Sequence, residues 1–181
     1  MATATEAARY LVQLATADPE DEPMTPLRLH KLLYFCQGWY LAWYDRPLFA
    51  DEVEAWEHGP VVPVVYAHSW GRGSGPIGDL GDPCDLSAVD QKAIEQVWRG
   101  YRKYSAWGLR DMTHNESPWK NHYDANSDGR CKNVIPGDEL ARFFKDEYQR
   151  ITGEPVDDDA DYSIASARVL TIDQLTKEVD W

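Results

Sequence analysis

The sequence has 181 residues with 31 acidic and 18 basic side chains, which gives a formal net charge of −13. A chain of this length can bury a single core without disulfides or a structural metal. Its acidity argues against nucleic-acid binding, because an acidic surface repels phosphate backbones, and favours a basic protein partner. The most apolar run, 32–44, contains Gln37 and is too short to span a bilayer, so we expect no membrane protein.

Three cysteines, Cys36, Cys84 and Cys131, are odd in number and too widely spaced for a disulfide framework or for paired zinc ligands. Glu6 and Arg9 interrupt the first apolar stretch, which is unlike a secretory signal. We therefore expect a cytoplasmic protein that holds no metal or other cofactor.

Two helix starts lie near the beginning of the chain. Thr3 and Glu6 have the spacing of a capping box, which predicts a helix that ends near residue 17. Thr25 followed by Pro26 is a second start, because threonine caps a free amide and proline suits the first helical turn. That helix should run to about residue 44. It is apolar on nearly all sides, which is typical of a central core helix.

The pattern changes after residue 46. Apolar and polar residues alternate there, which predicts a small β element near 48–58. Gly59 and Pro60 are a turn signal at its end. A short helix entered through Pro63 should follow, then a glycine-rich loop at 71–76. A second short strand is predicted at 77–80.

Serine caps predict most of the remaining helices. Ser87 with Asp90 opens one helix, Ser105 caps a helix at 106–114, and Ser117 before Pro118 starts a single turn that contains Trp119. A last core helix is predicted at 137–149. Four tryptophans in helical patterns are expected to be buried: Trp39, Trp43, Trp98 and Trp107. The fold class is therefore mainly α, a compact bundle around a buried central helix at about 26–44 with the small β element.

The end of the chain differs from the rest. Residues 151–181 carry eight acidic side chains against two basic ones, and an acidic linker is predicted after Pro155. Thr171 with Gln174 then resembles a capping box. The amphipathic set that follows can grip a groove on a partner or dock on its own domain: Ile172, Leu175, Val179 and Trp181. We divide the chain into a domain at 1–150 and an acidic linker with an amphipathic tail at 151–181.

Catalytic and metal-binding signals are weak. The histidines lie outside any nucleophile, metallohydrolase or phosphate-loop motif, so no enzymatic function is expected. His58 either fixes the turn at Gly59 or contacts a partner, and His114 lies where two predicted helices meet. The stretch 124–129 matches the first half of a calcium loop, but Ile135 stands where a bidentate glutamate is needed, and a polar turn is the alternative.

Two longer stretches resemble a known family. Residues 29–68 contain HKLLYFCQGWYLA, RPLF and EAWEHGPVVPVVY, and residues 105–120 contain SAW and THNESPWK. Both stretches are similar to the SocA-like antitoxin family, also called the Panacea domain, and the similarity extends over about 5–149. The loop 123–133 looks longer than is usual in that family.

The resemblance implies a small, mainly helical domain of bacteria and their phages that neutralises a toxin by direct binding. Its partner would be a cognate toxin encoded by an adjacent gene. Two alternatives stay open: an adaptor that delivers the toxin to a protease, or an enzymatic or metal-dependent domain using His58, His114 or the loop at 124. The candidate partner-binding residues are Trp56, His58, Gly59 and Pro60 in the turn, and Ile172, Leu175, Val179 and Trp181 in the tail.

Overall fold

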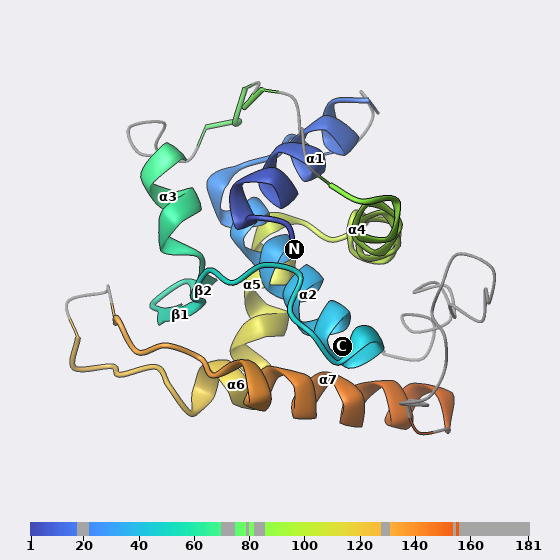
Figure 1. The fold of residues 1–181 in the computed structure, drawn as a ribbon. Coiled ribbons are helices and arrows are strands. Elements are labelled where there is room, and N and C mark those ends of the chain that lie inside the picture. The colour runs from blue at the N-terminus through green and yellow to red at the C-terminus, as the bar shows by residue number, and fades with distance from the viewer. Residues whose placement is uncertain are drawn as a thin grey trace.

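A computed structural model describes residues 1–17, 22–69, 75–78, 80–81, 86–127, 131–153 and 155, without the side chains of 68 and 69. Seven helices and one two-stranded sheet lie within these ranges (Figure 1). In chain order they are α1 (Ala4–Thr16), α2 (Pro26–Tyr44), β1 (Glu54–Trp56), β2 (Gly59–Val61), α3 (Pro63–Ser69), α4 (Ala88–Tyr101), α5 (Ala106–Asn115), α6 (Ser117–Lys120) and α7 (Gly137–Thr152). The predicted mainly α class is confirmed.

Helix α2 is the centre of the bundle, as predicted. The Thr25 side chain accepts the amide of Arg28, Pro26 lies in the first turn, and Asp45 ends the helix in the left-handed conformation. Every residue from Arg28 to Trp43 is buried. Helices α1, α3, α4, α5 and α7 and strand β2 all contact α2, which crosses the middle of Figure 1.

Four helix starts follow local capping chemistry. Thr3 with Glu6 and Ser87 with Asp90 form capping boxes, and Ser105 caps α5 through the amide of Gly108. The prediction that Ser117 caps α6 is wrong. The carbonyl of Glu116 accepts the Lys120 amide at 3.1 Å, so Glu116 is the cap residue and Ser117 is already helical.

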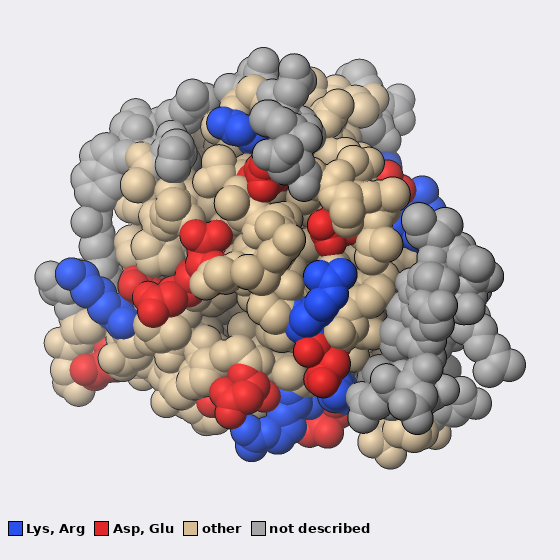
Figure 2. All heavy atoms as spheres, in the orientation of Figure 1, with Lys and Arg blue, Asp and Glu red and all other residues tan. Residues whose placement is uncertain are grey.

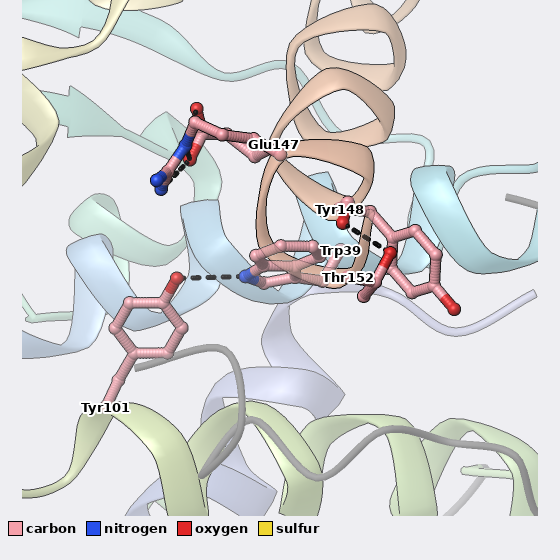
Figure 3. Close-up of polar contacts among 6 residues, drawn as sticks. Trp39, Tyr101, Glu147, Tyr148 and Thr152 are labelled. Atoms are coloured by element: carbon pink, nitrogen blue, oxygen red, sulfur yellow. Dashed lines mark hydrogen bonds and ion pairs between the residues drawn. The ribbon is translucent and has the colours of Figure 1, made fainter. Parts of the chain in front are cut away.

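Helix α7 packs closely on α2 because Gly38 has no side chain. A Cβ there would lie 2.0 Å from Cε2 of Phe144, whose ring meets the rings of Trp39 and Tyr34 edge-on. The Trp39 indole donates to the Tyr101 hydroxyl at 2.9 Å and joins α2 to α4 (Figure 3). This side of α2 is an aromatic seam.

The sheet is a tight hairpin. Strands β1 and β2 are antiparallel, with Trp56 opposite Gly59 and a two-residue turn between them. The backbone of β1 also exchanges hydrogen bonds with 133–135 on its other side, where Ala55 donates to Asn133 and Ile135 donates to Val53.

The β element predicted near 48–58 is therefore confirmed at Glu54–Trp56, whereas the second strand predicted at 77–80 is wrong. Ile77 donates one backbone hydrogen bond to Met24, and Ile77, Gly78 and Leu80 lie outside any strand. The partner of β1 is instead the Gly-Pro segment that the sequence marks as a turn. Proline is tolerated there because an edge strand leaves one row of amides unused.

Within the described ranges, no helix is both long enough and apolar enough to cross a membrane. The predicted linker and tail at 154 and 156–181 lie outside the described residues.

Candidate functional site: the hairpin corner

The two stretches that carry the family resemblance meet at the β1–β2 hairpin. The carbonyl of Pro60 accepts the ammonium of Lys31 from α2 at 2.6 Å. The carbonyl of Trp56 accepts the indole N–H of Trp119 from α6 at 2.8 Å. The hairpin is therefore tied to the bundle from both of its strands.

Gly59 can be replaced by no other residue without strain. Its φ is +91°, and a Cβ would lie 2.7 Å from the Thr113 hydroxyl and 2.8 Å from Cε of Lys31. Both the backbone conformation and the lack of space require glycine here. Gly59 thus fixes how closely the hairpin approaches α2 and α5.

An aromatic group supports the other side of the hairpin. The ring of Trp56 meets Tyr66 of α3 edge-on at 4.8 Å, and His30 lies 5.9 Å from the same tyrosine. His30 Nδ1 accepts the amide of Val62 at 3.4 Å. Burial, followed by the charge of Lys31, lowers the pKa of His30 to about 3, so its ring is a neutral acceptor near pH 7.

His58 and Trp107 form the outer edge of the corner. His58 is exposed at the turn, and its ring lies 6.1 Å from that of Trp107 on α5. Trp107 is 60% exposed, so the prediction that it is buried is wrong. Ala106 and Leu109 occupy the inward face of α5, which leaves Trp107 on the outward face. The guanidinium of Arg110 lies 5.4 Å over the indole.

Exposed apolar side chains gather around this hairpin. Among the described residues the large hydrophobics that are exposed are Met1, Val64, Trp107 and Val134. Val64 follows β2 by three residues, and Val134 forms a bridge with Glu54 of β1. Three of these four side chains thus border the hairpin. We call Trp56, His58, Val64, Trp107 and Val134 the hairpin surface.

Basic side chains lie at and beneath this surface. Lys31 is fully buried, and burial followed by the charge of Arg110 holds its pKa well below the usual value. The ring of His114 stacks on Trp119 at 3.8 Å. Burial, followed by the charges of Arg110 and Lys31, lowers the pKa of His114 to about 4 although Asp111 opposes the fall, so this ring is also neutral near pH 7.

The junction that follows His114 is anchored to the core by a half-buried acid. The Tyr34 hydroxyl donates to the Glu116 carboxylate at 2.6 Å. Burial raises the pKa of Glu116 to about 8 although this hydrogen bond opposes the rise. The bond ties the start of α6 to α2, in keeping with the structural role expected at this helix junction.

The stretch proposed as half of a calcium loop forms a polar turn. Asp124 accepts the backbone and side-chain N–H groups of Asn126, and Ile135 is buried rather than facing the loop. Residues 128 and 129 lie outside the described residues. In the parts of the chain that the structure describes, no group of three or more His, Cys, Asp or Glu side chains could hold a metal ion.

The structure therefore brings Trp56, His58, Gly59 and Pro60 together in one corner. The other four predicted contact residues, Ile172, Leu175, Val179 and Trp181, lie outside the described residues. Sequence reasoning missed Lys31, Thr113 and Arg110. The available signal was a lysine among the apolar residues of the central helix, because such a charge needs a dedicated partner.

The hairpin and the helices that hold it lie inside a match to a known protein family. The family profile described as "Antitoxin SocA-like, Panacea domain" matches residues 29–120, about half of the chain, from α2 through the hairpin to α6. Antitoxin SocA of Caulobacter vibrioides (strain NA1000 / CB15N) is 52% identical over 46 residues, which cover 25% of this chain and 24% of that protein. The match thus spans about a quarter of the curated relative's length. No solved structure matches the chain. By the extent of the profile match, the chain belongs to the SocA-like antitoxin family with a Panacea domain.

Proposed function

We propose that this protein is the antitoxin of a bacterial or phage toxin–antitoxin pair and that it neutralises its toxin by direct binding in the cytoplasm. The observation that carries the proposal is the hairpin surface, where exposed apolar side chains border a hairpin that lies inside the family match. The protein acts as a stoichiometric partner and not as an enzyme.

The hairpin is suited to binding because it is held in place before a partner arrives. Lys31 and Trp119 fix its backbone, and Gly59 sets its distance from α5. A rigid binding element loses little conformational entropy in a complex, so more of the contact energy becomes affinity. Trp107 is the expected anchor, because exposed tryptophans that become buried often dominate binding energy.

Charge adds a longer-range contribution. On the face shown in Figure 2, acidic and basic side chains are interspersed over the described surface. The net charge of −13 owes much to residues 151–181, with eight acidic side chains against two basic ones. A tail of that charge would speed encounter with a basic toxin, and Ile172, Leu175, Val179 and Trp181 would then form a second contact.

The test is to express the product of the neighbouring reading frame alone and together with this chain. Toxicity that co-expression relieves, with a stable complex on co-purification, supports neutralisation by binding. Relief with loss of the toxic protein that depends on a host protease would instead identify an adaptor. Absence of toxicity and of any complex would contradict the proposal.

The contribution of the tail has its own test. Helix α7 ends at Thr152 and Gly153 caps it, so a chain truncated after Gly153 keeps every helix that the structure describes. This truncation should weaken rescue of growth while the circular dichroism spectrum and melting temperature stay close to those of the full chain. Full rescue by the truncated chain would show that the tail does not contribute to toxin binding.

A further inference from the structure

We propose that, in the free protein, the acidic run at 157–161 docks on the outer face of α4, along a set of basic side chains that we call the α4 basic strip: Lys92, Arg99, Arg102 and Lys103. Both partners of this contact belong to the same chain, so the inference does not depend on the proposed function. It names where the tail lies before a toxin arrives.

The outer face of α4 carries a shallow groove. Its volume is about 370 Å³, and among the described residues only side chains of α4 line it: Ala88, Gln91, Lys92, Glu95, Gln96 and Arg99. All six are exposed or half-buried, whereas the opposite face of α4 packs on α1 and α2. The groove therefore opens outward, where another segment can lie in it.

The outer face of α4 is positive within an acidic protein. Residues 88–103 contain the four side chains of the α4 basic strip against the acids Asp90 and Glu95. Asp90 is buried and hydrogen-bonded to a tyrosine of α2, so it does not face the groove. Glu95 lies in the groove, 3.6 Å from Arg99. The outward side of α4 therefore keeps a surplus of positive charge.

The tail begins with the opposite charge. Residues 154–161 contain no basic side chain and five acidic ones: Glu154, Asp157, Asp158, Asp159 and Asp161. Fully extended, the run 157–161 spans about 13 Å. Lys92 and Arg99 are about 10 Å apart along the axis of α4. The two charge patterns are therefore similar in length.

The end of α7, from which the tail departs, lies near the end of α4. The ring of Trp39 packs on α7, and its indole donates to Tyr101, the last residue of α4, at 2.9 Å (Figure 3). Burial raises the pKa of Tyr101, and the charges of Glu116 and, on α7, of Glu147 raise it further. The nine residues at 153–161 can span about 30 Å. The acidic run can therefore reach the α4 basic strip without any rearrangement of the domain.

The covalent connection makes weak ionic contacts sufficient. Single exposed ion pairs contribute little in water. A short linker holds the acidic run near the strip at an effective concentration on the order of millimolar, and several weak pairs then act together. Added salt should loosen the contact, because ions screen exposed charges beyond about 10 Å at 0.1 M.

The first experiment uses NMR on the full-length chain at low salt. A linker variant combines four substitutions: Asp157→Asn, Asp158→Asn, Asp159→Asn and Asp161→Asn. The backbone amide signals of 88–103 should shift between the wild type and this variant, whereas those of the hairpin at 54–61 should not. Signals at 88–103 that are identical in the two chains would overturn the proposal.

Salt and protein concentration identify the partner of the strip. Raising the salt from about 0.05 M to about 0.5 M should shift the signals of 88–103 in the wild type and leave them nearly unchanged in the linker variant. Diluting the protein by about tenfold should change nothing, because a contact within one chain does not depend on protein concentration. A shift on dilution would assign the strip to the tail of a second copy and overturn the proposal.

The second experiment changes the strip instead of the linker. Lys92→Gln combined with Arg99→Gln should shift the signals of 157–161, since both basic side chains line the groove. Lys132→Gln is the matched control, because Lys132 is exposed and adjoins Asn133, which pairs with β1. It should leave those signals in place. Equal shifts in the strip variant and in the control would show a general effect of charge and overturn the proposal.

The contact makes a separate prediction for the toxin complex. A basic toxin surface would compete with the α4 basic strip for the same carboxylates. The strip variant should therefore bind the toxin at least as fast as the wild type and rescue growth equally well. Slower binding or weaker rescue would assign the strip itself to the toxin and overturn the proposal. A chain that has no toxin but shows the α4 shifts loses the proposed function and keeps the docked tail.

Discussion

The aromatic seam between α2 and α7 and the hairpin corner rest on the same helix but differ in composition. In the seam, Phe144 fills the space left by Gly38 and lies against Trp39 and Tyr34. In the corner, the buried side chains of α2 are His30 and Lys31. The seam contributes stability through close apolar packing, whereas the corner combines buried polar side chains with an exposed tryptophan that contributes little to folding.

The comparison suggests that α2 divides its roles along its axis, since Lys31 lies seven residues before Gly38 on the same face of the helix. Substitutions in the seam should destabilise the protein, and those on the outer part of the corner should spare the fold and impair binding. Four predictions test this division.

The largest effect is expected in the seam. Phe144→Ala removes a fully buried ring and should lower the free energy of unfolding by about 3–5 kcal/mol, measured by urea denaturation. Phe143→Ala on the same helix is the control, and it should have a smaller effect because Phe143 is only partly buried. Similar losses for both would contradict the close packing of α7 on α2.

The next effect concerns the support of the hairpin. Gly59→Ala places a Cβ at positive φ against Thr113 and Lys31, and should lower the free energy of unfolding by about 1–3 kcal/mol. It should also reduce toxin binding, because the hairpin must move. Gly137→Ala is the control, since a Cβ there meets nothing within 4 Å. If Gly59→Ala leaves the free energy of unfolding unchanged, the hairpin does not require the close contact with Thr113 and Lys31 that glycine allows.

A pH effect should follow from His30. Its pKa is about 3 in the folded chain against 6.5 for an unperturbed histidine, so the fold favours the neutral ring. This stabilisation is complete above pH 6.5 and is lost as pH falls from 6.5 towards 3. His30→Gln should therefore make stability less dependent on pH over that interval, as measured by melting temperature. If the pH dependence of the melting temperature is the same in His30→Gln and in the wild type, groups other than His30 take up the protons.

The smallest effect on folding is expected at the outer edge of the corner. Trp107→Ala should change the free energy of unfolding by less than about 0.5 kcal/mol, because the side chain is 60% exposed. Rescue of growth from the toxin should nevertheless fall, and affinity should drop by about tenfold or more. An exposed residue on α4, Arg99→Ala, serves as the control. Full rescue by Trp107→Ala would show that the indole does not contribute to toxin binding.

Local chemistry explains which parts of the fold were predictable. Thr3, Thr25, Ser87 and Ser105 cap their helices through neighbouring amides, so the helix starts can be read from the sequence. Strand β2 could not be read in that way, because Gly-Pro is a turn signal. It becomes a strand only through its pairing with β1 and its contact with Lys31.

The candidate site was predictable only in outline. The turn at Trp56, His58, Gly59 and Pro60 stands out in the sequence, but its neighbours come from residues 31 and 107–119. Trp107 follows the same helical pattern as buried tryptophans, and only the placement of α5 decides that it faces solvent. Such a choice between two faces of a helix depends on contacts that are distant in the chain.

The most direct test of the account is hydrogen exchange of the full-length chain with and without the neighbouring toxin. We predict protection from exchange in the hairpin and the start of α5, at 54–64 and 105–111, with little change along α7. Protection confined to α7, to α4 or to residues 151–181, with an unchanged hairpin, would contradict the claim that the hairpin corner binds the toxin.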